Sequence, residues 1–159
     1  MKRTIFLAIS FCLFLMQVSF AQNSKKKPEP KVPAVVQQAF SAKYPNLKVK
    51  DWDWEAQKET YEADFIVDNV EKEASFSTAG KWLKTKTEIT KAELPAPVTK
   101  AGTTGELAAW QMIDFSHIES PDKGVYYKIR FKKGQEEQSL KFDANGKQME
   151  KKGGSDKKS

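Results

Sequence analysis

The chain has 159 residues, of which 30% are charged and 11% aromatic, and its formal net charge is +6 at pH 7. It contains one cysteine and one histidine. This composition excludes an internal disulfide framework and a zinc site built from several Cys and His ligands.

The first 21 residues have the three parts of a secretory signal peptide. Lys2 and Arg3 precede the apolar run Ile5–Val18, which is shorter than the roughly 20 residues that a membrane span needs. Small residues follow, so we expect cleavage between Ala21 and Gln22. The mature protein is then periplasmic or secreted, and it lacks cysteine and a membrane anchor. An uncleaved anchor is the alternative.

Basic segments flank the expected folded region. Residues 22–31 contain "KKKPEPK" and residues 151–159 read "KKGGSDKKS". Both have Pro or Gly and no apolar periodicity, which is typical of a solvated linker and a disordered tail. The rest of the chain has no basic stretch interleaved with aromatic residues, so we do not expect nucleic acid as a partner.

Residues 32–90 predict one helix followed by four antiparallel strands. Pro33 suits a first helical turn, and apolar residues recur at helical spacing as far as Phe40. Tyr44–Asn46 ends the helix. The expected strands are Leu47–Glu55, Thr60–Val67, Val70–Thr78 and Lys81–Thr87. Alternation places one set of side chains beneath the helix: Tyr61, Ala63, Phe65, Val67, Ala74, Phe76 and Leu83.

Residues 91–150 repeat this pattern with a weaker helix. The positions of Tyr61, Phe65, Phe76 and Gly80 recur at one constant offset as Tyr127, Phe131, Phe142 and Gly146. Gly102 to Gly105 interrupts the second helix. Asn145-Gly146 indicates a hairpin, and a change of parity indicates a bulge between Met112 and Ile113.

The expected fold class is therefore α+β, a tandem repeat of a helix plus a four-stranded antiparallel meander. The domains would be residues 32–90 and 91–150. The connecting segment Thr85–Pro95 is short, and one continuous saddle-like sheet is the limiting case.

The segments "VPAVVQQAFSAKYPN", "YEADF", "FSTAGKW", "ELPAPV" and "KFDANGKQM" resemble the PepSY-like, β-lactamase-inhibitor-protein-like (BLIP-like) family of exported bacterial proteins. The resemblance implies tandem helix-plus-four-strand units and export. It also implies that modulation of a peptidase is a plausible role, whereas it implies no particular activity.

Nothing in the sequence predicts an enzyme. His117 is the single histidine, and Ser116 beside it on a strand would point to the opposite face, so the two form no triad. Asp114 or Glu119 could approach His117, but the spacing matches no metal motif. We therefore expect no catalytic residue, metal or cofactor.

The tryptophans indicate a binding surface instead. If Leu47, Val49 and Leu83 lie beneath the helix, alternation turns Trp52, Trp54 and Trp82 to the uncovered face. There they would join charged side chains in a partner-binding surface: Trp52, Trp54, Trp82, Glu62, Asp64 and Lys84. Aromatic residues can also stabilise a sheet through cross-strand pairs, and a bulge could return a tryptophan to the core.

We expect an exported, non-enzymatic module that binds a protein or peptide partner in the cell envelope, such as a peptidase or another enzyme that it modulates. The alternative is a periplasmic sensor or carrier of a small ligand or cation. Glu62 and Asp64 are replaced in the second unit by Lys128 and Arg130, so we expect an acidic first half and a more basic second half.

Overall fold

The computed structural model describes residues 30–149. The predicted signal peptide, most of the predicted linker and the predicted basic tail lie outside these residues. Within residues 30–149, no helix has the length and apolar character that crossing a membrane requires.

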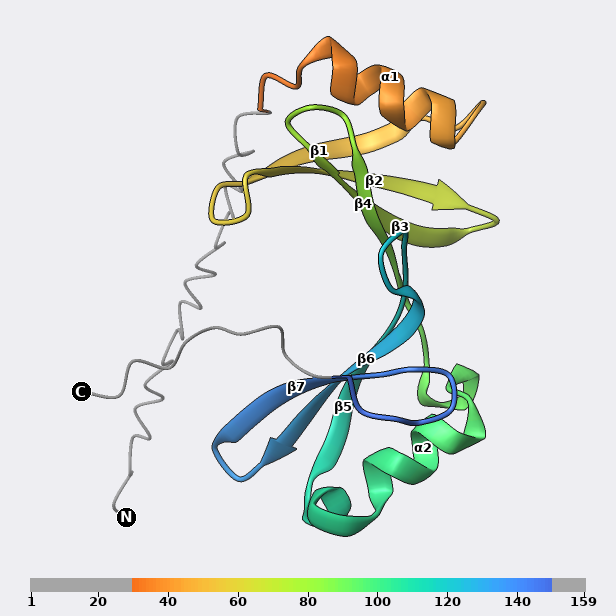
Figure 1. Ribbon diagram of the computed structural model, residues 1–159, viewed down its shortest axis with the longest axis vertical. Helices are drawn as coiled ribbons and strands as arrows, with labels where there is room; N and C mark the ends of the chain where they lie inside the picture. The colour runs from red at the N-terminus through yellow and green to blue at the C-terminus, as the bar shows by residue number, and fades with distance from the viewer. Residues whose placement is uncertain (1–29, 150–159) are drawn as a thin grey trace, which may run out of the picture.

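The elements follow the expected order (Figure 1). They are α1 (Ala34–Lys43), β1 (Val49–Glu55), β2 (Thr60–Val67), β3 (Val70–Ser77), β4 (Trp82–Glu88), the 3₁₀ turn Lys91–Glu93, α2 (Ala96–Thr103), the 3₁₀ turn Gly105–Ala109, β5 (Gln111–Ser120), β6 (Gly124–Lys133) and β7 (Glu136–Phe142).

All seven strands belong to one antiparallel sheet in the order β1-β2-β3-β4-β5-β6-β7. The α+β class and a continuous sheet are therefore confirmed. The eighth strand that the sequence predicted is not formed within residues 30–149. After a turn, Gln148 makes one isolated bridge to Phe142, and the Met149 N–H donates to the Lys141 carbonyl at 2.8 Å.

Helix α1 covers the first half of the sheet. It starts after Pro33, whose carbonyl accepts the N–H of Val36 at 3.0 Å. Val36 and Phe40 are one turn apart on the inner side, and they are 0% and 3% exposed. The ring of Phe40 meets that of Phe65 edge to face at 5.2 Å. Burial of such side chains contributes about 1.5–3 kcal/mol each, which explains why a short helix is stable here.

Helix α2 covers the second half. Val98 points into a core formed with Leu94, Ile129, Phe131 and Phe142. Gly102 lies directly against Met112 and Phe131, so the helix approaches the sheet closely there. The predicted bulge is confirmed, since the register of β5 against β6 shifts between Met112 and Asp114.

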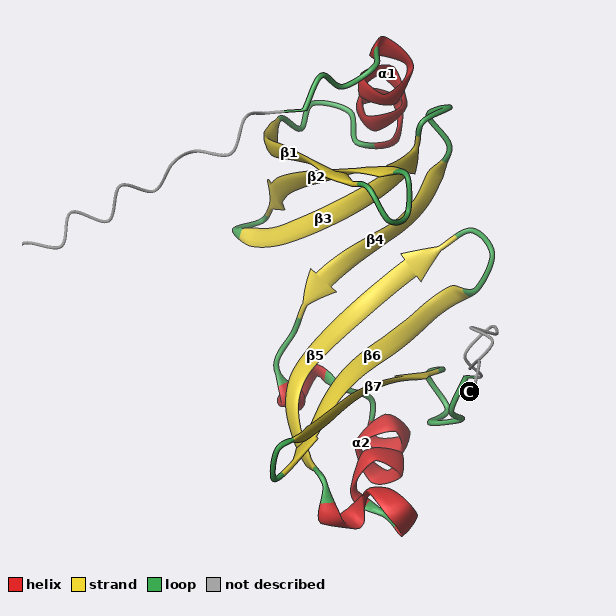
Figure 2. Cartoon of the chain, turned by 90° about the vertical axis from the view of Figure 1, so that its left-hand side faces the viewer, coloured by secondary structure: helices red, strands yellow, loops and turns green. Residues whose placement is uncertain are grey.

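Both helices lie on the same face of the sheet. Residues that pair across neighbouring strands share a face, so Thr85 lies on the same face as Ala74 of the α1 core. Thr87, two residues further along β4, is on that face too, and it pairs with His117. His117 in turn pairs with Tyr127, which packs against the α2 core. The helices occupy opposite ends of this face (Figure 1), and Figure 2 shows the strands from the other side. That second face, called the open face below, is covered by no helix of residues 30–149.

A glycine turn meets each helix near its start. Gly80 has φ +79°, and a methyl group on it would lie 2.8 Å from the Val35 carbonyl oxygen. Gly146 has φ +80°, and a methyl group there would collide with the Pro97 carbonyl. Both positions therefore need glycine for two reasons, the left-handed backbone and the contact with the helix.

We expect Gly146→Ala to lower the free energy of unfolding by about 3 kcal/mol, because strain and overpacking add. Gly134→Ala is the matched control, since Gly134 has φ +60° and nothing within 4 Å of an added methyl group. It should cost only about 1–2 kcal/mol. Urea denaturation of both variants measures the difference, and equal losses would contradict the helix contact.

Candidate binding face

A β-bulge in β1 determines where two tryptophans point. Val49 pairs with Phe65, but Asp51 pairs with Asp64, so β1 contains one extra residue. Trp52 therefore pairs with Ala63, and Trp54 with Tyr61. The predicted orientation of Trp52 and Trp54 toward the uncovered face is wrong, because the bulge reverses the alternation after Val49.

The contacts of Trp52 and Trp54 agree with this register. The ring of Trp52 lies 6.0 Å from that of Phe40 and 6.5 Å from that of Phe76, within the core under α1. Trp54 and Tyr61 form a ring pair at 4.7 Å on the same face.

A second bulge, in β4, does the same for Trp82. Ser75 pairs with Lys84 whereas Phe76 pairs with Trp82, and Leu83 is the extra residue. Trp82 therefore lies on the helix face, and the prediction that it points away from the helix is also wrong. Its indole N–H donates to Thr85 Oγ1 at 3.0 Å, and Lys43 Nζ lies 3.4 Å from its ring centroid. Leu83, predicted beneath the helix, is outside the core that α1 covers.

The tyrosine that ends α1 completes this arrangement. The hydroxyl of Tyr44 forms a short hydrogen bond with Thr85 Oγ1. Burial raises the pKa of Tyr44, so its hydroxyl stays neutral. The aromatic side chains of the helix face thus hold α1 on the sheet. The tryptophans among them contribute to packing.

The charged residues of the predicted surface do lie together on the open face. Glu62 pairs with Ser75, and Ser75 with Lys84, so all three share that face. Lys84 Nζ is 3.7 Å from Glu62 Oε1 and 3.0 Å from Glu73 Oε1. Ser75 Oγ donates to Glu62 at 3.1 Å. Contact of Glu62, Asp64 and Lys84 with a partner stays a prediction.

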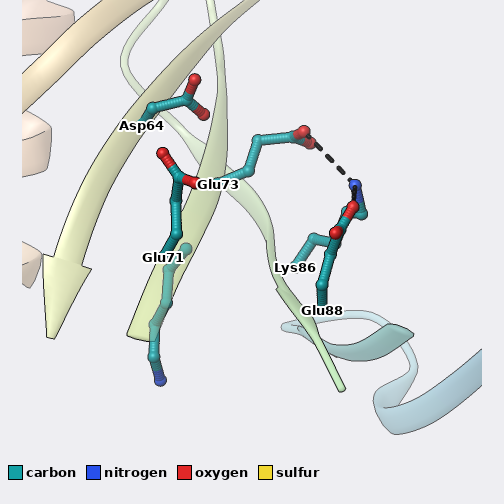
Figure 3. A pocket seen from close by; sticks show the side chains of 6 residues that line it. Asp64, Glu71, Glu73, Lys86 and Glu88 are labelled. Carbon is teal, nitrogen blue, oxygen red and sulfur yellow. Dashed lines mark hydrogen bonds and ion pairs between the residues drawn. The ribbon is translucent and has the colours of Figure 1, made fainter. Parts of the chain in front are cut away.

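A polar hollow of about 250 Å³ lies beside these residues and is lined mainly by charge (Figure 3). Lys86 Nζ approaches Glu88 Oε1 at 3.1 Å and Glu73 Oε2 at 3.9 Å. Partial burial, with the nearby carboxylates of Glu73 and Glu71, raises the pKa of Asp64. The hollow therefore has negative charge that its lysines only partly balance.

The open face of the second half has an apolar floor that sequence reasoning missed. Ile118 pairs with Lys86 on one side and with Tyr126 on the other, and the two are only 4% and 5% exposed. Lys141 Nζ lies 5.6 Å from the Tyr126 ring centroid. Alternation from Ile129 would have placed Tyr126 on this face, but it would not have predicted that Tyr126 is buried there.

A second hollow, of about 450 Å³, continues along this half between β4, β5 and β6. Its lining includes charged side chains of both signs and three apolar side chains. Its lining is Lys86, Glu88, Ile89, Ile113, Asp114, Phe115, Ser116, Lys128, Arg130 and Ser139. Arg130 is already paired, with Asp114 and, at 3.6 Å, with Glu137.

Residues 30–149 contain no group of three or more His, Cys, Asp or Glu side chains placed to hold a metal ion. His117 lies on the helix face, where its ring is 5.6 Å from that of Tyr127 and its Nδ1 is 4.0 Å from Glu119. Ser116, on the neighbouring position, pairs with Lys128 of the open face. The two side chains therefore point to opposite faces.

The family profile described as "Putative beta-lactamase-inhibitor-like, PepSY-like" matches residues 19–65 and 59–150. No curated protein sequence matches the chain.

Solved structures share the fold. A BLIP-like protein from Bacteroides fragilis NCTC 9343 is 26% identical, with a TM-score of 0.64 over 74% of this chain and 83% of that one. A DUF2874 family protein from Bacteroides ovatus ATCC 8483 is 22% identical, with a TM-score of 0.67 over 76% and 86%. A structure from Bacteroides eggerthii DSM 20697, described as "putative periplasmic proteins", is 22% identical, with a TM-score of 0.65 over 76% and 88%.

The raised pKa of Asp64 predicts a pH-dependent stability. Because the folded state disfavours the ionised carboxylate, Asp64 weakens the fold as pH rises through its raised pKa. Asp64→Asn should therefore raise the melting temperature at about pH 7, and that gain should vanish near about pH 3, below the ordinary carboxyl pKa of about 4.

Asp68→Asn, in the exposed turn between β2 and β3, is the matched control for this substitution. Calorimetry at the two pH values compares the variants. A gain for Asp64→Asn that is the same at both pH values would contradict the electrostatic cause.

Proposed function

Because the chain belongs to the PepSY-like family of beta-lactamase-inhibitor-like proteins, we propose that it is an exported, non-enzymatic module that binds a protein or peptide partner through the open face of its sheet. The protein is periplasmic or secreted, in agreement with the described location of its structural relative from Bacteroides eggerthii. An envelope enzyme such as a peptidase is the partner class that the family resemblance favours.

The observation that carries this proposal is the contrast between the two faces. The helix face is filled by α1, α2 and the aromatic residues beneath them. The open face has two shallow hollows, rows of charged side chains and no covering element within residues 30–149. Polar, hollowed surfaces of this size suit recognition of another macromolecule more than a small ligand, which needs a deep and mostly apolar pocket.

The site residues of the proposal differ in part from those expected from the sequence. Glu62, Asp64 and Lys84 remain proposed contact residues, because the register places them on the open face. The three tryptophans act indirectly, since Trp52 and Trp82 pack against the α1 core and Trp54 pairs with Tyr61 on the same face.

We also propose that the two halves descend from one duplicated unit. Gly80 and Gly146 occupy corresponding turns and each contacts the start of a helix. Phe76 and Phe142 are equivalently buried before those turns. The open faces, in contrast, carry different charges, so the two halves would contact different parts of one partner.

Site-specific photocrosslinking tests the binding face. Benzoylphenylalanine in place of Asp64, in cells that export the protein, should give a discrete adduct with one partner. The matched position is Gln38, exposed on α1, which should give none. Adding Lys84→Glu to the Asp64 probe should abolish the adduct, because it reverses the charge within the ion-pair network.

Adducts of equal yield from both positions, or an adduct from Gln38 alone, would show that the open face is not the binding surface.

A further inference from the structure

Two lysines stand directly opposite each other in the second half of the open face. Lys128 of β6 and Lys141 of β7 are cross-strand partners, so their side chains leave the same face side by side. Like charges in such positions destabilise a sheet. Replacing either lysine with a neutral residue would therefore remove this repulsion and stabilise the sheet, unless a bound partner neutralises the pair.

Two further lysines add to this charge. Partial burial lowers the pKa of Lys141, and the positive charges of Lys123, Lys128 and Lys84 lower it further. Lys123 lies in the turn that joins β5 to β6, and Lys84 lies on β4. Lys141 itself lies over the buried ring of Tyr126, with its Nζ 5.6 Å from the ring centroid.

Lys123, Lys128 and Lys141 differ from Lys84 and the other cations of the open face, because they lack a counter-charge among residues 30–149. Lys84 and Lys86 are paired with Glu62, Glu73 and Glu88. Arg130 and Lys132 both approach Glu137. Among residues 30–149, no carboxylate lies within ion-pair distance of Lys123, Lys128 or Lys141. We call these three residues the lysine cluster.

We infer that the lysine cluster is the docking site for an acidic segment of the protein partner, a stretch of chain that carries at least two neighbouring carboxylates. This inference rests on the proposed function and gives the partner a chemical character. The carboxylates of the segment would neutralise the lysines, which have no carboxylate of residues 30–149 within ion-pair distance. The ammonium groups would bind these carboxylates with charge-assisted hydrogen bonds.

The surroundings of the cluster suit a chain segment. Lys128 also lines the second hollow, which extends along the sheet toward β4 and provides room for several residues of peptide. The apolar floor of Ile118 and Tyr126 is already covered, so recognition here depends on charge more than on apolar contact. Binding should therefore weaken as ionic strength rises.

Fluorescence anisotropy with a labelled hexaglutamate peptide at low salt tests the inference on the purified protein. Lys128→Gln/Lys141→Gln should weaken binding at least about tenfold, since two charge-assisted contacts are lost. The matched control is Lys91→Gln/Lys100→Gln, which removes the same charge from exposed sites on α2 and the turn before it, and it should change affinity less than about twofold.

Equal weakening in both double variants, or undiminished binding by the cluster variant, would overturn the inference, because general charge or the basic termini would then hold the peptide. Absence of binding by the unaltered protein would overturn it as well. If the Asp64 photocrosslink still forms in that case, the proposed function stands and only the assignment of an acidic segment falls.

Two readouts separate this role from a structural one. Lys141→Gln alone should leave the melting temperature unchanged or raise it, because it removes a repulsive pair. NMR of the methylated lysines should show that hexaglutamate raises the pKa of Lys141. A lower melting temperature, or a pKa of Lys141 that does not respond to the peptide, would contradict the inference.

Discussion

Two β-bulges decide which face of this sheet is aromatic and which is charged. The extra residue in β1 reverses the alternation between Val49 and Trp52, and the extra residue in β4 reverses it between Trp82 and Lys84. Because the side-chain period of a strand is two residues, one inserted residue moves every later side chain to the other face. The orientation of Trp52, Trp54 and Trp82 toward the helix face follows from these two insertions.

The tryptophans that the bulges turn to the helix face stabilise the packing of α1 on the sheet. Trp52 and Trp82 extend the core of Val36, Phe40, Phe65 and Phe76, and Tyr44 is tied to β4 through Thr85. The glycine turns then let both helices sit close to the sheet. The open face over β1 to β4 therefore carries mainly charged side chains, and around the first hollow its carboxylates outnumber its lysines. The lysine cluster lies on β6, β7 and the turn before β6.

The sequence was sufficient for both helices, for the seven strands and for most of the core, but it also predicted an eighth strand that is not formed within residues 30–149. Helical spacing identified Val36 and Phe40, alternation identified Tyr61 to Val67, and the Met112–Ile113 bulge was visible because the parity of apolar residues changes there. The bulges of β1 and β4 left no such signal. The segment "VKDWDWE" reads as alternating in either register, and in "KWLKT" both Trp82 and Leu83 are apolar, so only pairing with the neighbouring strand resolves the choice.

The proposed contact residues also fall into two groups, those that the sequence placed correctly and those that only the structure reveals. Glu62, Asp64 and Lys84 could be placed on the open face because β2 and the end of β4 keep a regular register. The lysine cluster depends on a cross-strand pair between β6 and β7 and on a turn, which a linear pattern of charges does not reveal. The sequence also predicted that Lys128 and Arg130 replace Glu62 and Asp64 on the corresponding strand, and the register places these four side chains on the open face. A more basic second half stays a prediction.

Nuclear Overhauser effects from the indole of Trp52 test whether the tryptophans lie on the helix face and leave the open face to charged side chains. We expect strong cross-peaks to the ring of Phe40 and to the methyl groups of nearby helix-face residues. Cross-peaks from Trp52 to the side chains of Glu62 or Asp64, without those to Phe40, would contradict the account.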